Sequence, residues 1–354
     1  MTYRVAVVGA TGAVGTVMLA KLRERDFPAS EIVPFASARS AGRKLDGTIV
    51  QPLSDETIQG FDIAIFSAGG ATSGEWARRF VDAGAVVVDN SSKWRRDPEV
   101  PLVVAEVNPD ALEGHKGLIA NPNCSTMQLT VALKPIHDAA GIERLIVSTY
   151  QSVSGTGVKA VEELEAQTHA VLHGQEPPAP QVYPQQIAFN VLGGAGTFAA
   201  GDDHTDEERK MMFETRKILG DESIPVNVTC ARVPVVSSHS ESVTVQTREP
   251  LGVERARELL AAMPGLTLVD PYPTALGAAG HDDVFVGRLR RDPTHERGLC
   301  MWVVSDNLLK GAATNAIQIA EVLHARKLVR VPNVTSSAGR SLRSPRTKPV
   351  SAVP

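Results

Sequence analysis

The stretch Tyr3-Arg4-Val5-Ala6-Val7-Val8 followed by Gly9-Ala10-Thr11-Gly12-Ala13-Val14-Gly15 decides the fold of this chain. A valine-rich run ends in a glycine turn, and the turn passes into an apolar helical pattern through Met18, Leu19 and Leu22. Strand, glycine turn and helix in this order begin a Rossmann unit, whose helix N-terminus attracts a pyrophosphate. The glycines stand at 9, 12 and 15 rather than in the commoner Gly-x-Gly-x-x-Gly spacing, so a purely structural turn is the alternative. The turn residues expected at the cofactor are Gly9, Thr11, Gly12, Ala13 and Val14.

Further strands and helices alternate along the first 120 residues. Apolar runs at 32–35, 61–66 and 85–88 predict strands, and 75–81 predicts a helix. Such alternation is typical of a doubly wound parallel sheet with its ligand across the carboxyl ends of the strands. Small residues at 67–73 follow one of these strand ends, so Ser67 and Gly69 are expected beside the cofactor.

The segment after the second strand indicates which dinucleotide binds. An NAD site is expected to carry an acidic residue there for the ribose hydroxyls, whereas this chain has Ser37, Arg39 and Ser40. A cation and hydroxyl donors suit a 2′-phosphate, so NADP is predicted over NAD. A solvated arginine in a surface loop is the alternative.

A single cysteine stands in Asn121-Pro122-Asn123-Cys124-Ser125-Thr126, at the start of a helical apolar pattern. The thiolate is the nucleophilic form, and the positive end of a helix with a cationic neighbour is the usual way to lower a thiol pKa from ~8.5. An inert buried cysteine is the competing interpretation.

Polar residues follow several other predicted strands and helices, and each of them taken alone has a structural explanation as well as a functional one. Gln151 ends a strand predicted at 144–150 and is a candidate to orient a carbonyl, and Ser154-Gly155 is a candidate approach to a nicotinamide, although turn and cap roles explain both equally well. Arg95, in the loop 89–97, is either part of an oxyanion pocket or solvated. Glu207 and Lys210 lie three apart on a helix, where a surface ion pair competes with a substrate role.

Arg232 continues an otherwise apolar strand face at 226–234. A buried unpaired charge is costly, so this arginine must meet an anion or a wet pocket. His239 lies at the entrance of the next strand and is the best candidate for a general base among the nine histidines. A long helix is expected at 307–328, with Asn307, Asn315 and Gln318 near the ribose or nicotinamide.

Composition excludes several classes of protein. The 354 residues carry a net charge of −4, with 43% hydrophobic residues, so there is no basic footprint for nucleic acid or for a membrane surface. No signal peptide and no bilayer-spanning run are evident. Three widely spaced cysteines predict neither disulfides nor a metal site, so a cytoplasmic location is expected. The Ser-, Arg- and Pro-rich tail at 333–354 is expected to be disordered.

The chain resembles the aspartate-β-semialdehyde dehydrogenase family from nearly its first residue to about Arg330. The resemblance rests on the turn at 9–15, Asp89-Asn90-Ser91-Ser92 with Arg95, Asn121-Pro122-Asn123-Cys124-Ser125-Thr126, Gln151 with Ser154-Gly155, Glu207 with Lys210, and Arg232 with His239-Ser240-Glu241. It implies an NADP-dependent oxidoreductase that reversibly converts L-4-aspartyl phosphate to L-aspartate 4-semialdehyde and phosphate through an acyl-thioester intermediate. This reaction belongs to lysine, threonine, methionine, isoleucine and diaminopimelate biosynthesis.

The resemblance also implies a role for each matching residue. Cys124 is the thioester nucleophile, His239 the acid/base, and Gln151 a group that orients the substrate. Arg232 is the partner of the substrate carboxylate, and Glu207 lies close to the substrate amine.

By the same resemblance, Arg95 and Lys210 hold phosphate, with Asn90 nearby. The family implies an α/β homodimer whose subunit has two domains. A Rossmann-type doubly wound parallel sheet forms an NADP-binding domain at 1–122 plus 308–330. A second, α+β, catalytic and dimerisation domain spans 123–307.

Three alternatives compete with this interpretation. One is a sibling phosphate-linked enzyme, such as an N-acetyl-γ-glutamyl-phosphate reductase or a glyceraldehyde-3-phosphate dehydrogenase. Another is a non-catalytic NADP-binding relative, although its expected sign, loss of the cysteine, histidine or arginine, is absent from the sequence. The third is an oligomeric structural protein on a Rossmann core, which leaves Arg232 unexplained.

Overall fold

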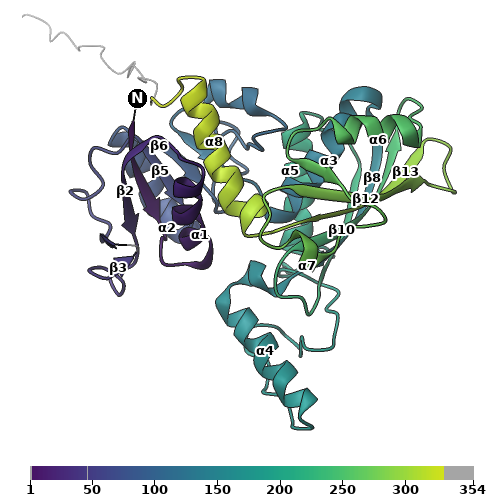
Figure 1. Cartoon of the computed structure of the whole chain (residues 1–354), viewed down its shortest axis with the longest axis horizontal. Coiled ribbons are helices and arrows are strands. Elements are labelled where there is room, and N and C mark those ends of the chain that lie inside the picture. Colours follow the sequence, from purple (N-terminus) through teal and green to yellow (C-terminus); the bar gives the residue numbers. More distant parts are fainter. Residues whose placement is uncertain (1, 46, 331–354) are drawn as a thin grey trace, which may run out of the picture.

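The computed structural model describes residues 2–45 and 47–330, which form two bodies side by side (Figure 1). The N-terminal body is built on a five-stranded sheet and the second body on a six-stranded sheet. The last described helix, α8 (Thr314–Ala325), returns from the second body and packs into the core of the first. The predicted tail at 333–354 lies outside the described residues.

The N-terminal sheet is parallel and has the strand order β2-β1-β5-β6-β7. Its strands are β1 (Tyr3–Val8), β2 (Ala29–Phe35), β5 (Ile63–Phe66), β6 (Val86–Asp89) and β7 (Leu118–Ala120). Strands β5 and β6 are buried at every residue, as expected where helices cover both faces of a parallel sheet. Helices α1 (Ala13–Glu24) and α8 cover one face, and α2 (Gly69–Asp82) covers the other. The predicted doubly wound fold is confirmed.

Short elements complete the N-terminal body. Two short strands pair after β2, and a 3₁₀ helix precedes β7. These elements are β3 (Lys44–Leu45), β4 (Thr48–Ile49) and η1 (Pro109–Gly114).

The second sheet is mixed and has the strand order β11-β12-β13-β10-β8-β9. Its strands are β8 (Ile142–Gln151), β9 (Val226–Arg232), β10 (His239–Thr247), β11 (Leu266–Leu268), β12 (Val284–Arg291) and β13 (Gly298–Ser305). Three helices pack on one face: α3 (Cys124–Ala140), α5 (Asp206–Leu219) and α6 (Val253–Ala261). The opposite face carries Tyr150 and Trp302, whose ring centroids lie 5.3 Å apart, and the short helix α7 (Ala275–Ala278) follows β11.

The register of the second sheet brings three predicted site residues to one edge. Gln151 is the last residue of β8 and pairs with Arg232, the last residue of the parallel strand β9. His239 begins the antiparallel strand β10 and pairs with Ser305 at the end of β13. Strand β10 runs antiparallel to β8 and β9, so the start of β10 lies beside the ends of the other two strands, and the three residues meet at the same edge of the sheet.

A helical arm projects from the second body (Figure 1). It consists of η2 (Val153–Thr156), α4 (Val158–Leu172) and the loop that follows, which contains the Pro-rich segment. A small core of its own holds it together, and Ile187 and Leu192 contribute to that core. The stretch 187–192 is therefore split: Ile187 is buried, whereas Phe189 and Val191 are 62% and 60% exposed.

The C-terminal helix differs from the prediction of one continuous helix at 307–328. A π-helical turn, η3 (Leu309–Ala313), precedes α8, which ends at Ala325. The wider turn brings Gly311 against the second body, where an added Cβ would come within 2.8 Å of the Cys124 Cβ. The π-helical turn therefore lies where the chain packs closely against Cys124. The spacing of apolar residues in the sequence does not reveal such a contact, so the turn was not predicted.

Candidate active site

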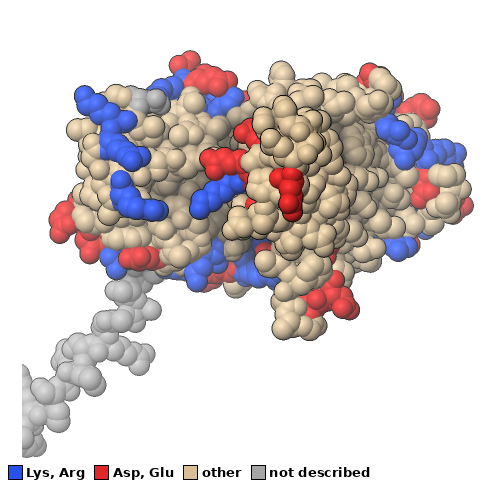
Figure 2. All heavy atoms as spheres, turned by 90° about the horizontal axis from the view of Figure 1, so that it is seen from below, with Lys and Arg blue, Asp and Glu red and all other residues tan. Residues whose placement is uncertain are grey.

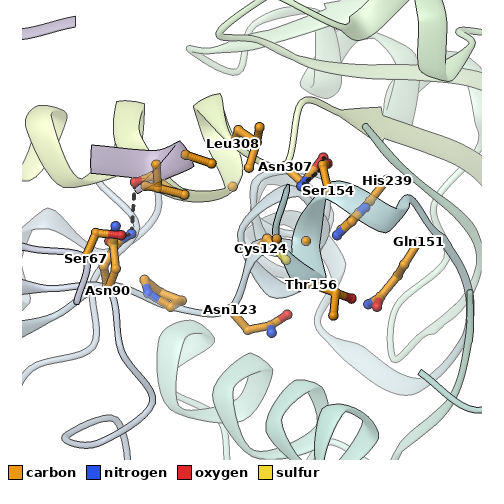
Figure 3. A pocket seen from close by; sticks show the side chains of 18 of the residues that line it. Ser67, Asn90, Asn123, Cys124, Gln151, Ser154, Thr156, His239, Asn307 and Leu308 are labelled. Carbon is orange, nitrogen blue, oxygen red and sulfur yellow. Dashed lines mark hydrogen bonds between the residues drawn. The ribbon is translucent and has the colours of Figure 1, made fainter. Parts of the chain in front are cut away.

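A cavity of about 460 Å³ lies between the two bodies (Figure 3). Its walls include the α1 turn, the segment between β7 and α3, the edge of the second sheet, the first turn of α5, and residues 307–312. The predicted site residues that line it are Gly12, Ala13, Val14, Ser67, Asn90, Arg95, Cys124, Gln151, Ser154, Gly155, Glu207, Lys210, Arg232, His239 and Asn307.

Other residues predicted at the cofactor lie outside this cavity: Gly9, Thr11, Ser37, Arg39, Ser40, Gly69 and Gln318. Gly9 is needed for the turn itself, because its φ is +88° and a Cβ would lie 2.3 Å from the Ser67 carbonyl oxygen. Ser37 and Arg39 are exposed in the loop after β2. Gly69 begins α2.

Asn315 and Gln318 are engaged in a buried polar network rather than facing the cavity. Lys310 is fully buried and donates to Glu106 at 2.5 Å and to Gln318 at 2.8 Å. Asn315 donates to Asn121 Oδ1 at 2.6 Å. The expected contact of Gln318 with the ribose therefore finds no support, because Lys310 and Glu106 occupy its amide.

Cys124 is the first residue of α3 and points into the cavity (Figure 3). Asn123 caps the helix by accepting a hydrogen bond from the Ser125 amide at 3.0 Å. This cap explains why the helix begins at the cysteine, as the sequence predicts.

The surroundings of Cys124 favour its protonated, thiol form. Burial, followed by the nearby charge of Glu207, raises the pKa of Cys124 to about 12, although Arg232 and Arg95 oppose the shift. The lowering expected from a helix end and a cation is thus outweighed, because desolvation penalises the thiolate more than these groups stabilise it.

His239 is a neutral imidazole with a defined tautomer. The Ser152 amide donates to Nδ1 at 3.1 Å, and a backbone amide can only donate, so Nδ1 holds a lone pair and Nε2 carries the proton. Nε2 faces the cavity beside Gly155, where a Cβ would lie 3.2 Å from it. Burial, followed by Arg232, lowers the pKa of His239 to about 3. The ring therefore offers an uncharged N–H donor to the cavity.

Arg232 is a buried cation without an ion pair in residues 2–45 and 47–330. Its Nη1 donates to the Ser152 carbonyl at 2.6 Å, and its buried Nε has no hydrogen-bond partner among the residues that the structure describes. Its guanidinium carbon lies 5.9 Å from the centre of the Tyr183 ring. The wet-pocket alternative of the sequence argument is the one observed, since the arginine lines the cavity and is free to bind an anion there.

Glu207 connects several groups on the wall of the cavity. Its Oε1 accepts hydrogen bonds from Asn123 Nδ2 at 2.9 Å and from Gln151 Nε2 at 3.1 Å. Lys210 lies 3.3 Å from the other oxygen and 2.6 Å from Asp206. The pair is therefore more than the surface ion pair that sequence alone favours, because Glu207 is buried and both members line the cavity.

Arg95 is buried rather than solvated. Its Nη1 pairs with Glu214 at 3.0 Å and its Nη2 donates to the Asn90 carbonyl at 2.7 Å, while its Nε finds no hydrogen-bond partner in the described part of the chain. Glu214 also accepts from the Asn123 amide at 2.6 Å, which links the arginine to the residue before the cysteine.

Three residues of the site were not found from the sequence. Glu214 holds Arg95, Ser152 orients His239, and Gly311 abuts Cys124. Helical spacing alone offered a signal for Glu214, which lies seven residues, about two turns, after Glu207 on α5.

The α1 turn fits a dinucleotide phosphate. Gly12 is the N-cap of α1 and makes no side-chain cap, so the first helical amides are free to donate to an anion. A Cβ on Gly15 would lie 2.2 Å from the Gly9 carbonyl oxygen, which explains the compact turn. Gly12, Ala13 and Val14 line the same cavity as Cys124.

Two family models match most of the chain. The model described as "Semialdehyde dehydrogenase, NAD binding domain" matches residues 4–115, and "Semialdehyde dehydrogenase, dimerisation domain" matches 133–310. Aspartate-semialdehyde dehydrogenase from Aquifex aeolicus is 52% identical over 341 residues, which cover 93% of this chain and 100% of that protein. The chain belongs to the aspartate-semialdehyde dehydrogenase family. Within that family, the Streptomyces akiyoshiensis enzyme is 51% identical over 91% of this chain and 98% of its own.

Solved structures of the aspartate-semialdehyde dehydrogenase family share the fold. Aspartate semialdehyde dehydrogenase II from Vibrio cholerae matches with a TM-score of 0.88 and 47% identity, over 92% of this chain and 99% of that one, and a second structure of it is complexed with ASA. The Candida albicans enzyme, solved with NADP, matches with a TM-score of 0.71 and 25% identity, over 93% and 100%. A nucleotide-binding Rossmann domain followed by a dimerisation domain is thus the architecture of this chain.

Charge and hydropathy add little to this description. Basic and acidic side chains are interspersed on the face seen in Figure 2. Among residues 2–45 and 47–330, no helix is long and apolar enough to cross a bilayer. The same residues contain no cluster of three His, Cys, Asp or Glu side chains suited to a metal ion.

Proposed function

We propose that this chain is an NADP-dependent aspartate-semialdehyde dehydrogenase that reduces L-4-aspartyl phosphate to L-aspartate 4-semialdehyde and phosphate, reversibly. One observation carries the proposal: a helix-start cysteine, a neutral imidazole N–H donor and an unpaired buried arginine line a single cavity beside the dinucleotide turn. The N-acetyl-γ-glutamyl-phosphate reductase alternative is not favoured, because the relatives at about 50% identity are aspartate-semialdehyde dehydrogenases.

Substrate binding follows from the charges of the cavity. Arg232, which has no carboxylate partner within residues 2–45 and 47–330, binds the substrate carboxylate, and Glu207 accepts a hydrogen bond from the substrate amine. Gln151 is fixed through its amide nitrogen, at 2.6 Å from Ser125 Oγ, so it orients the bound substrate. These contacts bring the aldehyde carbon to the Cys124 sulfur.

In the oxidative direction, the Cys124 sulfur bonds to the aldehyde carbon as the C=O π bond opens, and the thiol proton ends on the aldehyde oxygen. The Nε2–H of His239 gives its proton to the oxygen and Nε2 takes the proton of the sulfur, so a thiohemiacetal forms. The Nε2–H of His239 hydrogen-bonds the oxygen that becomes negatively charged, and we assign to this ring the proton exchange with that oxygen. When bound, the nicotinamide cofactor accepts the hydride, or supplies it in the reverse direction. Oxidation leaves an acyl thioester on Cys124.

Phosphate attacks that thioester from the side of Arg95 and Lys210, the C–S bond breaks, and aspartyl phosphate leaves while the Cys124 sulfur takes up a proton. Both cations are already paired, Arg95 with Glu214 and Lys210 with Asp206 and Glu207. Phosphate therefore binds to two cations that each keep a carboxylate partner, and Asn90 lies nearby in the wall of the cavity.

The cofactor preference is proposed from the loop after β2. This loop has no acidic residue at the ribose position, and Arg39 is exposed without a hydrogen bond or ion pair in the described part of the chain. Ser37 and Ser40 supply hydroxyls beside it, so the loop suits a 2′-phosphate. The C. albicans relative solved with NADP is consistent with this choice.

Domain division, assembly and location are proposed on separate grounds. The chain divides into 1–122 plus 308–330 and 123–307, a division supported by the two sheets and by the packing of α8 on the first. A homodimer forms through the face of the second sheet that carries Tyr150 and Trp302, since α3, α5 and α6 occupy the other face. A cytoplasmic location is supported by three free cysteines.

A single assay tests the reaction: phosphate-dependent reduction of NADP⁺ with aspartate semialdehyde, repeated with N-acetylglutamate semialdehyde and without phosphate. Turnover is expected only with aspartate semialdehyde and phosphate. Cys124→Ala is expected to abolish it and to leave NADPH affinity within about threefold, because the cysteine bonds to substrate and not to the nucleotide. Activity in that variant, or turnover with the acetylated substrate alone, contradicts the proposal.

A further inference from the structure

Glu241 is a fully buried carboxyl group that the mechanism above does not use. It lies on β10 two residues after His239, so both side chains project from the same face of the strand. Its exposed fraction is 0%, and within the described part of the chain neither of its oxygens makes a hydrogen bond of normal geometry. A buried polar group without a partner is costly, so this arrangement needs an explanation.

The residues around Glu241 form a polar layer directly behind the catalytic one. Thr149 pairs with Glu241 across the sheet and precedes Gln151 by two residues on the same face of β8. Gln128 follows Cys124 by four residues, about one turn of α3, and influences the pKa of Glu241. Each member of this layer is therefore one step along its strand or helix from a residue of the active site.

Gln128 has hydrogen-bonding groups that are not used by other described residues. Its Oε1 accepts a hydrogen bond from Ser305 Oγ at 2.6 Å, and its buried Nε2 has no hydrogen-bond partner among the described residues. An amide oxygen has a second lone pair, and the amide nitrogen has two hydrogens to donate. Gln128 thus offers one acceptor position and free donors, the complement of a protonated carboxylic acid.

The charges near Glu241 do not favour its ionised form. No lysine, arginine or histidine nitrogen in residues 2–45 and 47–330 forms an ion pair with it. His239 on the same strand is uncharged, and burial raises the pKa of the Cys230 thiol on β9, so that neighbour is uncharged as well. Burial likewise raises the pKa of Glu241 well above its ordinary value, and Gln128 only partly opposes this.

We propose that Glu241 is a positioning residue: as an uncharged carboxylic acid it exchanges hydrogen bonds with Gln128, and so ties β10, which begins with His239, to α3, which begins with Cys124. The acid O–H donates to the amide oxygen, and the amide N–H donates to the acid carbonyl. The pair thereby sets the separation of sulfur and imidazole. The inference rests on the roles proposed above for those two groups.

Infrared spectroscopy of the full chain without substrate tests the protonation state. The wild type minus Glu241→Gln difference spectrum at neutral pH is expected to contain the carbonyl stretch of a protonated carboxylic acid. The same difference taken with Glu249→Gln, an exposed glutamate just beyond the same strand, is expected to lack that band. A Glu241→Gln difference spectrum that shows the loss of a carboxylate instead overturns the proposal. This readout needs no turnover, so it stands even if the proposed reaction fails.

Kinetics test the positioning role. Glu241→Gln is expected to keep kcat within about threefold, because an amide replaces the neutral acid with little change of shape. Glu241→Leu is expected to lower kcat at least about tenfold while KM for NADP⁺ changes less than about twofold. Gln128→Leu is expected to show the same result, a lower kcat with little change in KM for NADP⁺. It replaces Glu241→Leu in the test if that variant fails to fold. A kcat unchanged in the folded leucine variants, or a large loss in Glu241→Gln, overturns the role.

Discussion

Replacing Arg232 by methionine removes a buried cation while keeping most of the side-chain volume. Among residues 2–45 and 47–330, its guanidinium makes one hydrogen bond of normal geometry, to the Ser152 carbonyl, and its other nitrogens are available to a ligand in the cavity. Truncating one member of a buried, hydrogen-bonded charge pair costs about 2–5 kcal/mol. At about 1.36 kcal/mol per factor of ten, kcat/KM for aspartate semialdehyde is expected to fall roughly 30- to 5,000-fold.

The free energy of unfolding should respond differently. Loss of the bond at 2.6 Å leaves the Ser152 carbonyl short of a donor, which costs about 1–3 kcal/mol. Removal of an unpaired buried charge acts in the opposite direction. The two effects oppose each other, so we expect the free energy of unfolding to change by less than about 2 kcal/mol. Activity and stability are thus expected to separate in Arg232→Met.

Steady-state kinetics, NADPH titration and thermal unfolding measure these effects. NADPH affinity is expected to stay within about threefold, because the expected loss concerns the carboxylate of the substrate. Arg144→Met, an exposed arginine on the neighbouring strand β8, is the matched control and should leave all three quantities unchanged. A kcat/KM for Arg232→Met within about threefold of wild type refutes the assignment of Arg232 to the carboxylate.

Three further outcomes are expected. Because burial raises the pKa of Cys124 to about 12, the rate of alkylation by iodoacetamide, measured against Cys124→Ala, should keep rising with pH beyond ~10, and a plateau near neutrality would contradict this. Gly311→Ala places a Cβ 2.8 Å from the Cys124 Cβ, so kcat should fall at least about tenfold, and full activity would show that the π-helical turn yields without moving the cysteine. Arg39→Gln should raise KM for NADP⁺ about tenfold and leave KM for NAD⁺ unchanged, whereas equal effects on both would remove Arg39 from the 2′-phosphate site.

Local signals in the sequence predicted the start of the site well. The glycine turn before α1 and the Asn-Pro-Asn-Cys segment before α3 each encode their own geometry, through glycine conformation and an asparagine cap. Arg232 was also predictable, because a charge on an apolar strand face demands a pocket.

Pairings between distant parts of the chain were not predictable. Arg95 is buried because Glu214, 119 residues later, takes its guanidinium, and nothing in the loop 89–97 indicates that partner. From the sequence, Gln318 was expected to bind the cofactor, but in the structure its amide is hydrogen-bonded to Lys310 and Glu106. The sulfur is protonated for the same reason, since desolvation by the assembled cavity is a property of the fold and not of the helix end.

The chain crosses between the two bodies twice, through 121–123 and again through 306–313, and both crossings line the cavity. Asn121 Nδ2 donates to the Ala312 carbonyl at 3.1 Å, so the crossings are fastened to each other beside Cys124. Because both crossings lie beside Cys124, a rotation of one body about them would displace the sulfur least and the outer part of the cavity most.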